Sequence, residues 1–245
     1  MTRRLEIAAN SLASAQAAQA AGATRVELCA ALEAGGLTPS AGAIASVRRR
    51  IALPVHVLVR PRAGDFCYSD AEHETMLADI AHCAASGCDG VVVGALTTRG
   101  EVDMDRCREL VEAAGGLDTT FHRAIDLCPD MPAALEAIVA LGFRRVLSSG
   151  GAADAVSGAD MLRRLVGQAG DRIVVMPGAG IAPDNIARLA AHTRAREFHA
   201  SARRPRPTRM RVPVDPALGM DGGEQRTDGE RIRALLSALH ATDAT

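Results

Sequence analysis

A set of polar side chains in this 245-residue sequence lies on or just beyond short apolar runs. Carboxylates and imidazoles can exchange protons with a bound molecule, and guanidinium groups bind phosphate or carboxylate through paired hydrogen bonds. The candidates for proton transfer are Glu6, Glu27, His122 and Asp126. The candidates for binding a substrate or an anion are Arg60, Arg62, Asp65, Arg123, His199 and Ser201.

His122 is the candidate whose protonation the sequence constrains most directly. Arg123 directly follows His122, and Asp126 lies four positions after His122, so charges of opposite sign lie near the ring. A nearby arginine lowers the pKa of a histidine, and a nearby carboxylate raises it. We therefore expect the pKa of His122 to lie close to neutrality, where the ring can both accept and donate a proton.

Two glycine-rich segments, 148–151 (SSGG) and 177–181 (PGAGI), form a second group of candidates. A glycine-rich turn that opens a helix presents free backbone N–H groups, which suit a phosphate or a carboxylate. The alternative is that the glycines only permit tight turns, and the sequence leaves both interpretations open. The anion-binding candidates in these segments are Ser149, Gly150, Gly178 and Gly180.

The basic residues and cysteines exclude some chemistry. All 28 basic residues are arginine, which forms no Schiff base, so lysine-dependent aldolases and pyridoxal enzymes are excluded. The six cysteines contain no C-x-x-C pair, which indicates free thiols in a reducing cytoplasm rather than disulfides. Cys29 is the one cysteine expected at a strand end facing the interior, and it is a weak candidate for Cu(I). Four others are expected to be small buried hydrophobic residues: Cys83, Cys88, Cys107 and Cys128.

These side chains must be positioned by an alternation of short apolar runs and longer helical patterns. The expected strands are 5–9, 25–29, 55–60, 89–93, 118–122, 145–148, 172–176 and 196–200, and the expected helices are 11–21, 40–50, 70–86, 103–114, 131–141, 159–168, 183–191 and 228–240. Gly22, Gly87 and Gly142 each end a helix shortly before a strand, as glycine at the C′ position does. Eight such units predict one (β/α)₈ TIM barrel spanning residues 1–245.

The loops after the strands are expected to form the site, because TIM barrels place it at the C-terminal ends of their strands. These loops are 30–39, 61–69, 148–154 and 177–183. A longer insertion, 202–226, precedes the last helix and is expected to be mobile or to face another subunit, with an anion clamp as the alternative. It carries Arg203, Arg204, Arg206, Arg209 and Arg211.

The motifs themselves resemble the CutC family, named for copper homeostasis. The resemblance runs in register from about Leu5 to Arg203, through the segments 26–30 (VELCA), 35–40 (GGLTPS), 60–66 (RPRAGDF), 68–70 (YSD), 120–124 (TFHRA), 146–150 (VLSSG), 176–180 (MPGAG) and 197–201 (EFHAS). It implies a cytoplasmic barrel protein, usually a homo-oligomer, associated with copper tolerance and proposed to bind Cu(I). Some relatives carry a cysteine in the first strand as well as the second, and this sequence has Ala8 and Cys29 at those positions.

Three functions remain open from the sequence. The resemblance favours a copper homeostasis protein that binds Cu(I), whereas the residues themselves favour an enzyme acting on a small phosphorylated or carboxylated substrate. A non-catalytic oligomeric scaffold is the third. The formal net charge of −1 indicates neither nucleic acid nor membrane as partner. The expected partners are therefore a copper ion or a small anionic molecule, and further copies of the chain.

Overall fold

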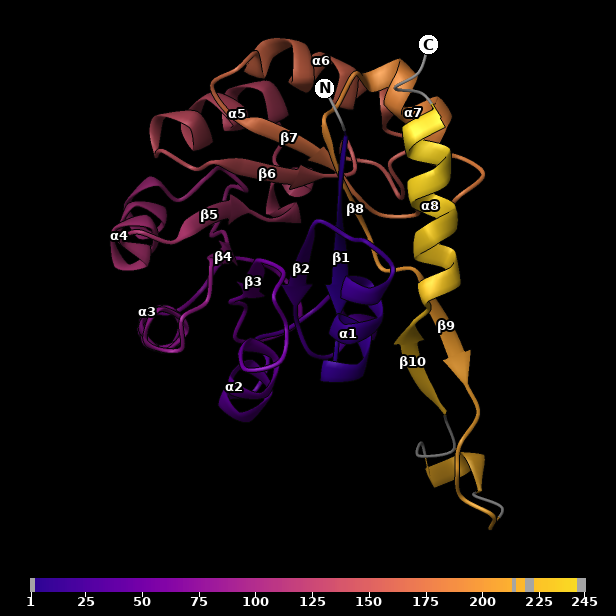
Figure 1. Cartoon of the computed structure of the whole chain (residues 1–245). Coiled ribbons are helices and arrows are strands. Elements are labelled where there is room, and N and C mark those ends of the chain that lie inside the picture. The colour runs from indigo at the N-terminus through magenta and orange to yellow at the C-terminus, as the bar shows by residue number, and fades with distance from the viewer. Residues whose placement is uncertain (1–2, 213–214, 219–222, 242–245) are drawn as a thin grey trace.

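The computed structural model describes residues 3–212, 215–218 and 223–241, and it has eight parallel strands in one sheet (Figure 1). The strands are β1 (Arg4–Ala9), β2 (Arg25–Leu28), β3 (Val55–Leu58), β4 (Gly90–Val93), β5 (Asp118–Phe121), β6 (Arg145–Ser148), β7 (Val174–Pro177) and β8 (Glu197–Ala200). Their hydrogen-bonded order is β7-β6-β5-β4-β3-β2-β1-β8. Since β8 also lies beside β7, the sheet curls into a nearly closed barrel. The predicted TIM-barrel fold is confirmed.

In the described residues, eight α-helices follow the strands and cover the outside of the barrel (Figure 1). They are α1 (Leu12–Ala20), α2 (Ala41–Arg48), α3 (Asp70–Ala85), α4 (Met104–Ala114), α5 (Met131–Ala140), α6 (Ala159–Ala169), α7 (Ile186–Thr193) and α8 (Gly229–Ala241). Side-chain N-caps explain several of the starts: the hydroxyl of Ser69, for example, accepts the N–H of Glu72 in a capping box. In the part of the chain that the structure describes, no helix combines the length and hydropathy needed to cross a membrane.

The start of α7 differs from the prediction. The helix was expected from Pro183 and begins at Ile186. The side chain of Asn185 accepts the N–H of Ala182 at 3.0 Å and donates to the carbonyl of Gly180 at 2.9 Å. These bonds hold Pro183 in a turn that precedes the helix.

The interior of the barrel is charged where many barrels are aliphatic. Arg25 forms a buried ion pair with Glu6 and donates to Glu197 at 2.8 Å. Arg145 donates to Glu197 at 2.9 Å and to Asp118 at 3.0 Å. Each of these buried charges thus has an opposite partner, which offsets the cost of removing it from water.

The insertion at 202–226 contains a two-stranded antiparallel arm that projects beyond the barrel (Figure 1). The arm consists of β9 (Arg203–Arg206) and β10 (Glu224–Thr227), and a short 3₁₀ turn lies at Pro216–Leu218. The hydroxyl of Thr227 donates to the carbonyl of Ala8 at 3.3 Å, which ties the base of the arm to β1. Residues 213–214 and 219–222 of the predicted insertion lie outside the described part.

Candidate functional site

A cavity of about 430 Å³ opens at the C-terminal ends of the strands. Its polar and charged lining comes from the ends of β2, β3, β5 and β8 and from the root of the arm, while apolar side chains form its walls. The lining residues with polar side chains are Glu27, Arg60, His122, Arg123, His199, Ser201 and Arg203. The structure therefore brings together polar residues from four of the predicted strand ends and one residue of the arginine-rich insertion.

Glu6, His199 and Glu27 form the deepest part of this site. Nδ1 of His199 lies 2.7 Å from Oε1 of Glu6, and Nε2 of the same ring lies 3.7 Å from Oε2 of Glu27. Both glutamates are buried. The other oxygen of Glu6 is held by Arg25, so Glu6 is fixed in place and orients the imidazole of His199. Glu27 lies on the other side of the ring and lines the cavity.

The two carboxyl groups have opposite pKa shifts. Burial raises the pKa of Glu27 to about 7, and the charge of Glu6 adds to the increase although His199 and Arg25 oppose it. Burial also penalises the charge of Glu6, but Arg25 and His199 hold its pKa well below its usual range. The pKa of His199 is raised because the two glutamates outweigh the effect of burial. Glu27 is thus poised to gain or lose a proton near neutral pH, whereas Glu6 stays ionised.

The same three residues are also the one group of potential metal ligands found among the described residues. Their ligand atoms lie within 4.8 Å of one another. Two carboxylates and an imidazole suit a divalent cation of intermediate hardness and are poor ligands for Cu(I).

His122 differs from the prediction that its pKa lies near neutrality. Burial lowers its pKa to about 3, and the charge of Arg60 lowers it further. The charges that the sequence places beside the ring act elsewhere, since Arg123 donates to Asp126 at 2.8 Å. His122 is therefore a neutral imidazole at physiological pH.

The hydrogen bonds of His122 define its tautomer. Nδ1 accepts the N–H of Ala124 at 3.3 Å, which leaves the proton on Nε2. Nε2 is buried and has no hydrogen-bond partner among the described residues. Phe66 packs against the ring at 4.6 Å between centroids, and a Cβ at Gly94 would approach the ring within 2.8 Å. The ring is held rigidly and offers a free N–H donor to the site.

Arg60 organises two of the predicted site loops. Its guanidinium donates to the carbonyls of Ala34, Gly36 and Gly64 at 2.8–3.0 Å, so that it connects loop 30–39 to loop 61–69. It lines the cavity, and its Nε is buried without a partner among the described residues. Most of its donors are therefore used within the protein rather than available for an anion.

Asp126 and the segment 148–151 are joined by hydrogen bonds. The Asp126 carboxylate accepts the N–H groups of Ser149 and Gly151 and the hydroxyls of Ser148 and Ser149, at 2.6–3.2 Å. Gly150 is pressed against Gly158, whose carbonyl oxygen would lie 2.3 Å from an added Cβ. This loop thus binds a carboxylate of its own chain, and neither Asp126, Ser149 nor Gly150 lines the cavity.

The glycines after β7 have different roles. A Cβ at Gly178 would lie 2.5 Å from Leu147 and 3.3 Å from Cβ of His199, so this glycine makes room for the histidine. Gly180 has a φ of 67° and lines the cavity together with Ala179 and Ile181. Of the two, Gly180 is the one in a position to contact a bound molecule.

Three further candidates lie outside the cavity lining. Arg62 pairs with Asp65 at 2.9 Å and with Glu72 at 2.6 Å on the loop after β3, where Asp65 is exposed.

Cys29 is buried in an apolar cluster with Leu58 and Val92, and its thiol donates weakly to the carbonyl of Ala9 at 3.8 Å. Burial and the charge of Glu27 raise the pKa of this thiol well above its usual value. A lone protonated thiol does not fit Cu(I).

Arg203 is the functional candidate that the sequence did not single out. It appeared only as one of five arginines in the insertion, yet it begins β9 and lines the cavity. Its guanidinium forms no ion pair with any described residue. The available signal was its position two residues after Ser201, at the end of the eighth predicted strand.

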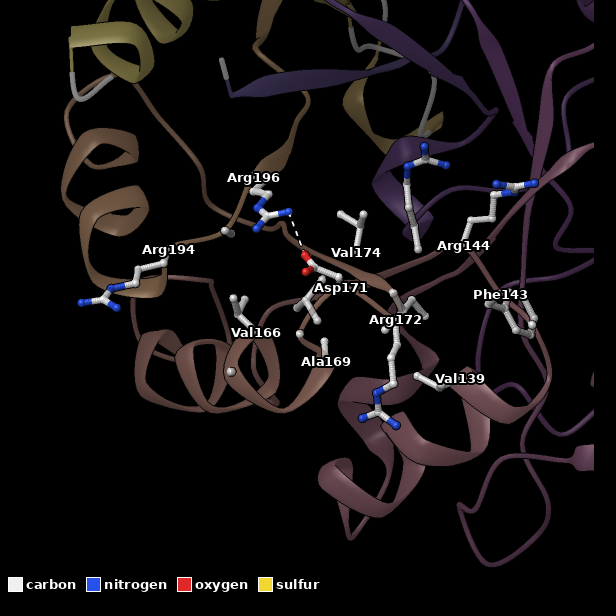
Figure 2. A pocket seen from close by; sticks show the side chains of 17 residues that line it. Val139, Phe143, Arg144, Val166, Ala169, Asp171, Arg172, Val174, Arg194 and Arg196 are labelled. Atoms are coloured by element: carbon white, nitrogen blue, oxygen red, sulfur yellow. Dashed lines mark hydrogen bonds and ion pairs between the residues drawn. The ribbon is translucent and has the colours of Figure 1, made fainter. Parts of the chain in front are cut away.

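A larger cavity lies at the opposite end of the barrel, where the strands begin (Figure 2). It has a volume of about 780 Å³ and five arginines in its lining, four of which pair with acidic residues of the chain. In Figure 2, Arg144, Arg172 and Arg194 point in different directions, and Arg196 pairs with Asp171 at 3.0 Å. Arg144 pairs with Asp118, and Arg172 pairs with Glu136. Because these guanidinium groups are used in ion pairs within the protein, we do not assign a binding site to this end of the barrel.

Comparison with known proteins identifies the family to which the chain is similar. The chain matches the CutC family model over residues 3–204. A CutC family protein from Xanthomonas campestris pv. campestris is 51% identical over 235 residues, which are 96% of this chain and 98% of the relative. The crystal structure of CutC from Streptococcus agalactiae has a TM-score of 0.77 and 32% identity, over 81% of this chain and 98% of that one. A thiamine phosphate pyrophosphorylase from Pyrococcus furiosus, at 14% identity and a TM-score of 0.60, covers 98% of this chain and 96% of its own and shares the fold alone.

Proposed function

The chain belongs to the CutC family, and we propose that it is an enzyme that transfers a proton at a carbon next to the carbonyl of a small anionic substrate. The observation that carries this proposal is the pairing, in one cavity, of Glu27 with a pKa of about 7 and a neutral His122 whose Nε2–H has no partner among the described residues. A carboxylate that can take a proton and a neutral N–H donor that can stabilise a developing oxyanion are the two groups that enolisation requires.

The roles of the residues follow from their surroundings. Glu27 removes the proton from the substrate carbon, and His122 donates a hydrogen bond to the carbonyl oxygen as negative charge develops there. His199 accepts or returns the proton of Glu27, because Glu6 holds its imidazole with Nε2 toward the Glu27 carboxyl group. A protonated His122 is not needed, just as a neutral histidine serves as electrophile in triosephosphate isomerase.

The anionic class of substrate is supported by two arginines. Arg203 has a guanidinium without an ion pair among the described residues, and Arg123 is partly exposed and lines the same cavity. The volume of about 430 Å³ is within the range of small-ligand sites. We therefore propose a phosphorylated or carboxylated compound of a few carbon atoms.

A Cu(I) function at the predicted residue fits the chain less well. The Streptococcus agalactiae relative is provisionally described as a copper homeostasis protein, and a cytoplasmic role of that kind is supported here by six unpaired cysteines. Cys29, however, is buried, protonated and without a second thiol, since Ala8 occupies the neighbouring position. We derive no function from copper at Cys29.

Association with a second copy is supported by the arm. Met210, Val212 and Leu218 are exposed large hydrophobic residues in the insertion. Apolar side chains of this kind on a projecting segment are typical of contact surfaces. We propose a homo-oligomer with the arm in the interface.

The test of the enzymatic proposal is proton exchange in D₂O. Small aldose and ketose phosphates and 2-oxo acids are incubated with the protein, and replacement of C–H by C–D is followed by NMR. We expect exchange in one compound class, its loss in Glu27→Gln and its reduction by about two orders of magnitude in His122→Asn.

The matched control is Arg62→Lys, which changes an arginine outside the cavity and should leave exchange unaltered. Exchange that persists in Glu27→Gln, or absence of exchange across both compound classes, would contradict the proposal. Addition of Zn²⁺ or Mn²⁺ provides a further arm: exchange that depends on the ion would assign Glu27 and His199 to metal binding instead of proton transfer.

A further inference from the structure

A second cavity adjoins the candidate site at the root of the arm. It has a volume of about 440 Å³, and its lining comes from the loops after β2, β7 and β8, from the arm and from α8. Ile181, Ser201 and Arg203 line this cavity and also the cavity that holds Glu27 and His122. We call the cavity with Glu27 the inner cavity and the second one the outer cavity. Because the two share these three residues, a molecule bound in the inner cavity can extend into the outer one.

The backbone around this junction contains unusual conformations. Four described residues other than glycine have a positive φ, and three of them are alanines at this end of the barrel: Ala31 at 46°, Ala179 at 76° and Ala202 at 46°. Ala179 lines the inner cavity and Ala202 the outer one, while Ala31 directly precedes Leu32 and Glu33, which line the inner and the outer cavity. A left-handed backbone is unfavourable for a residue with a Cβ, and such strain gathers at ligand-binding sites. The junction thus has the backbone features of a binding site.

Two arginines of the outer cavity have guanidinium groups that are not neutralised. Arg203 begins β9, and Arg231 lies in the first turn of α8, where its Nη1 donates to the backbone carbonyl of Arg203 at 2.8 Å. This hydrogen bond holds the Arg231 side chain beside the junction. Neither guanidinium forms an ion pair with any described residue, whereas that of the neighbouring Arg204 lies 3.6 Å from Asp228. The outer cavity therefore has two cationic groups available for a ligand.

The rest of the lining is compatible with an anion. Arg203 and Arg231 are half-buried, and Glu33, the one acidic residue in the described lining, is exposed. Ser201 and Gln225 add a hydroxyl and an amide that can donate hydrogen bonds. Guanidinium groups bind phosphate and carboxylate through charge-assisted, often paired hydrogen bonds. The ligand that these residues fit is an anionic group of that kind.

We propose that the outer cavity binds a second anionic group of the substrate, so that the substrate has an anionic group at each end, as in a bisphosphate or a phosphorylated carboxylic acid. The outer site rests on the proposed function, because the same molecule presents its carbonyl and the adjoining carbon to His122 and Glu27 in the inner cavity. Arg123 binds the first anionic group and Arg231 the second. Arg203 lies between the two cavities and contributes to both.

The same arrangement gives the root of the arm a part in binding. Gln225 of β10 lines the outer cavity, and its backbone carbonyl accepts a hydrogen bond from the side chain of Asn10 at 2.9 Å. Asn10 directly follows β1, so the outer cavity is built on strands that are tied to the barrel. A ligand that reaches Arg231 should therefore restrain β9 and β10, which a ligand confined to the inner cavity does not contact along their length.

The experiment is a calorimetric titration of the full-length protein at constant ionic strength. The probes are bisphosphates of straight-chain diols of increasing length, and the monophosphates of the same diols serve as references. A series of phosphorylated carboxylic acids distinguishes a second phosphate from a carboxylate. We expect a compound with two anionic groups, at one chain length, to bind at least about tenfold more tightly than its monophosphate.

The variant Arg231→Gln should bring the two affinities together, because it removes the cation that binds the second group. The matched control is Arg233→Gln, which removes the same charge from an exposed position of α8 outside both cavities and should keep the difference. Circular dichroism verifies that both variants are folded. Equal affinities at every chain length, or loss of the difference in Arg233→Gln as well as in Arg231→Gln, would overturn the outer site.

A second measurement uses the unaltered protein, so it remains decisive if a variant does not fold. Amide hydrogen exchange is followed by mass spectrometry with the bisphosphate and with the monophosphate at saturation. Exchange in the segments Arg203–Arg206 and Glu224–Thr227 should slow more with the bisphosphate, and equal slowing by both compounds would contradict the outer site.

The outer site and the proposed enzyme can fail separately. Binding that depends on Arg231, without any proton exchange in D₂O, would refute the enzyme and leave the anion site standing. Proton exchange in compounds whose affinity does not depend on Arg231 would refute the outer site and leave the enzyme standing.

Discussion

Nδ1 of His199 lies 2.7 Å from Oε1 of Glu6, and this contact links the charged interior of the barrel to the cavity at its mouth. Glu6 is also bound by Arg25, which in turn contacts Glu197. The imidazole is thereby fixed with its second nitrogen toward Glu27. Among the described residues Glu27 forms no ion pair with an arginine, so burial dominates its pKa, and the two glutamates of neighbouring strands have opposite pKa shifts.

The replacement Glu27→Gln should stabilise the protein at alkaline pH. The pKa of Glu27 is raised from 4.5 to about 7 in the folded state, so its ionisation destabilises the fold progressively as the pH rises from about 4.5 through 7. The gain of the variant over the wild type should therefore grow across this window to on the order of 3 kcal/mol. Urea denaturation at pH 4.5 and pH 8.5 measures it.

The matched variant Glu6→Gln should behave in the opposite way. Its carboxylate is ionised and paired, so its removal leaves Arg25 with one fewer partner and should cost about 3 kcal/mol at pH 7. An equal effect of pH on the stability of Glu27→Gln and of the wild type would show that Glu27 is not the carboxyl group with the raised pKa.

His122 should not titrate between pH 5 and 9. Burial and Arg60 place its pKa at about 3, well below the value near 6.5 of an unperturbed histidine. Histidine-resolved NMR should show constant shifts of the Nε2–H tautomer, with the urea-denatured chain as the titrating control. A midpoint near neutrality would return His122 to the role of proton carrier and remove it as the neutral donor.

Replacing arginines that line the cavity should weaken the binding of inorganic phosphate, whereas replacing an arginine outside the cavity should not. Arg123→Lys and Arg203→Lys should each weaken phosphate binding by about tenfold, because lysine lacks the planar fork of the guanidinium. Arg62→Lys should leave the affinity unchanged, since its guanidinium binds Asp65 and Glu72 outside the cavity. Calorimetric titration measures all three, and an equal loss in Arg62→Lys would refute the assignment of the anion site to the mouth.

Asp126→Asn should destabilise the protein without removing a catalytic group. The carboxylate of Asp126 accepts the backbone and hydroxyl donors of the segment 148–151 and the guanidinium of Arg123. An amide can accept on only one side, so a cost of about 1–3 kcal/mol is expected. Thermal unfolding tests this; an unchanged melting temperature would mean that the loop is ordered by other contacts.

Local signals in the sequence are enough to predict the fold and the end of the barrel at which the candidate site lies. Eight apolar runs separated by helical patterns and helix-ending glycines specify a parallel barrel, because these signals depend on residues that are near in the chain. Glu27, His122 and His199 were placed at strand ends on the same grounds, and the structure puts them in one cavity.

Which charges meet depends on contacts between strands that are far apart in the sequence. Glu6 and His199 are 193 positions apart, and Arg123 turns toward Asp126 and Ser149 instead of toward His122. The pKa of Glu27 and of His122 depends on burial and on distances of a few ångströms to groups on other strands. Coulomb energies change steeply over such distances, and the order of residues along the chain does not contain them.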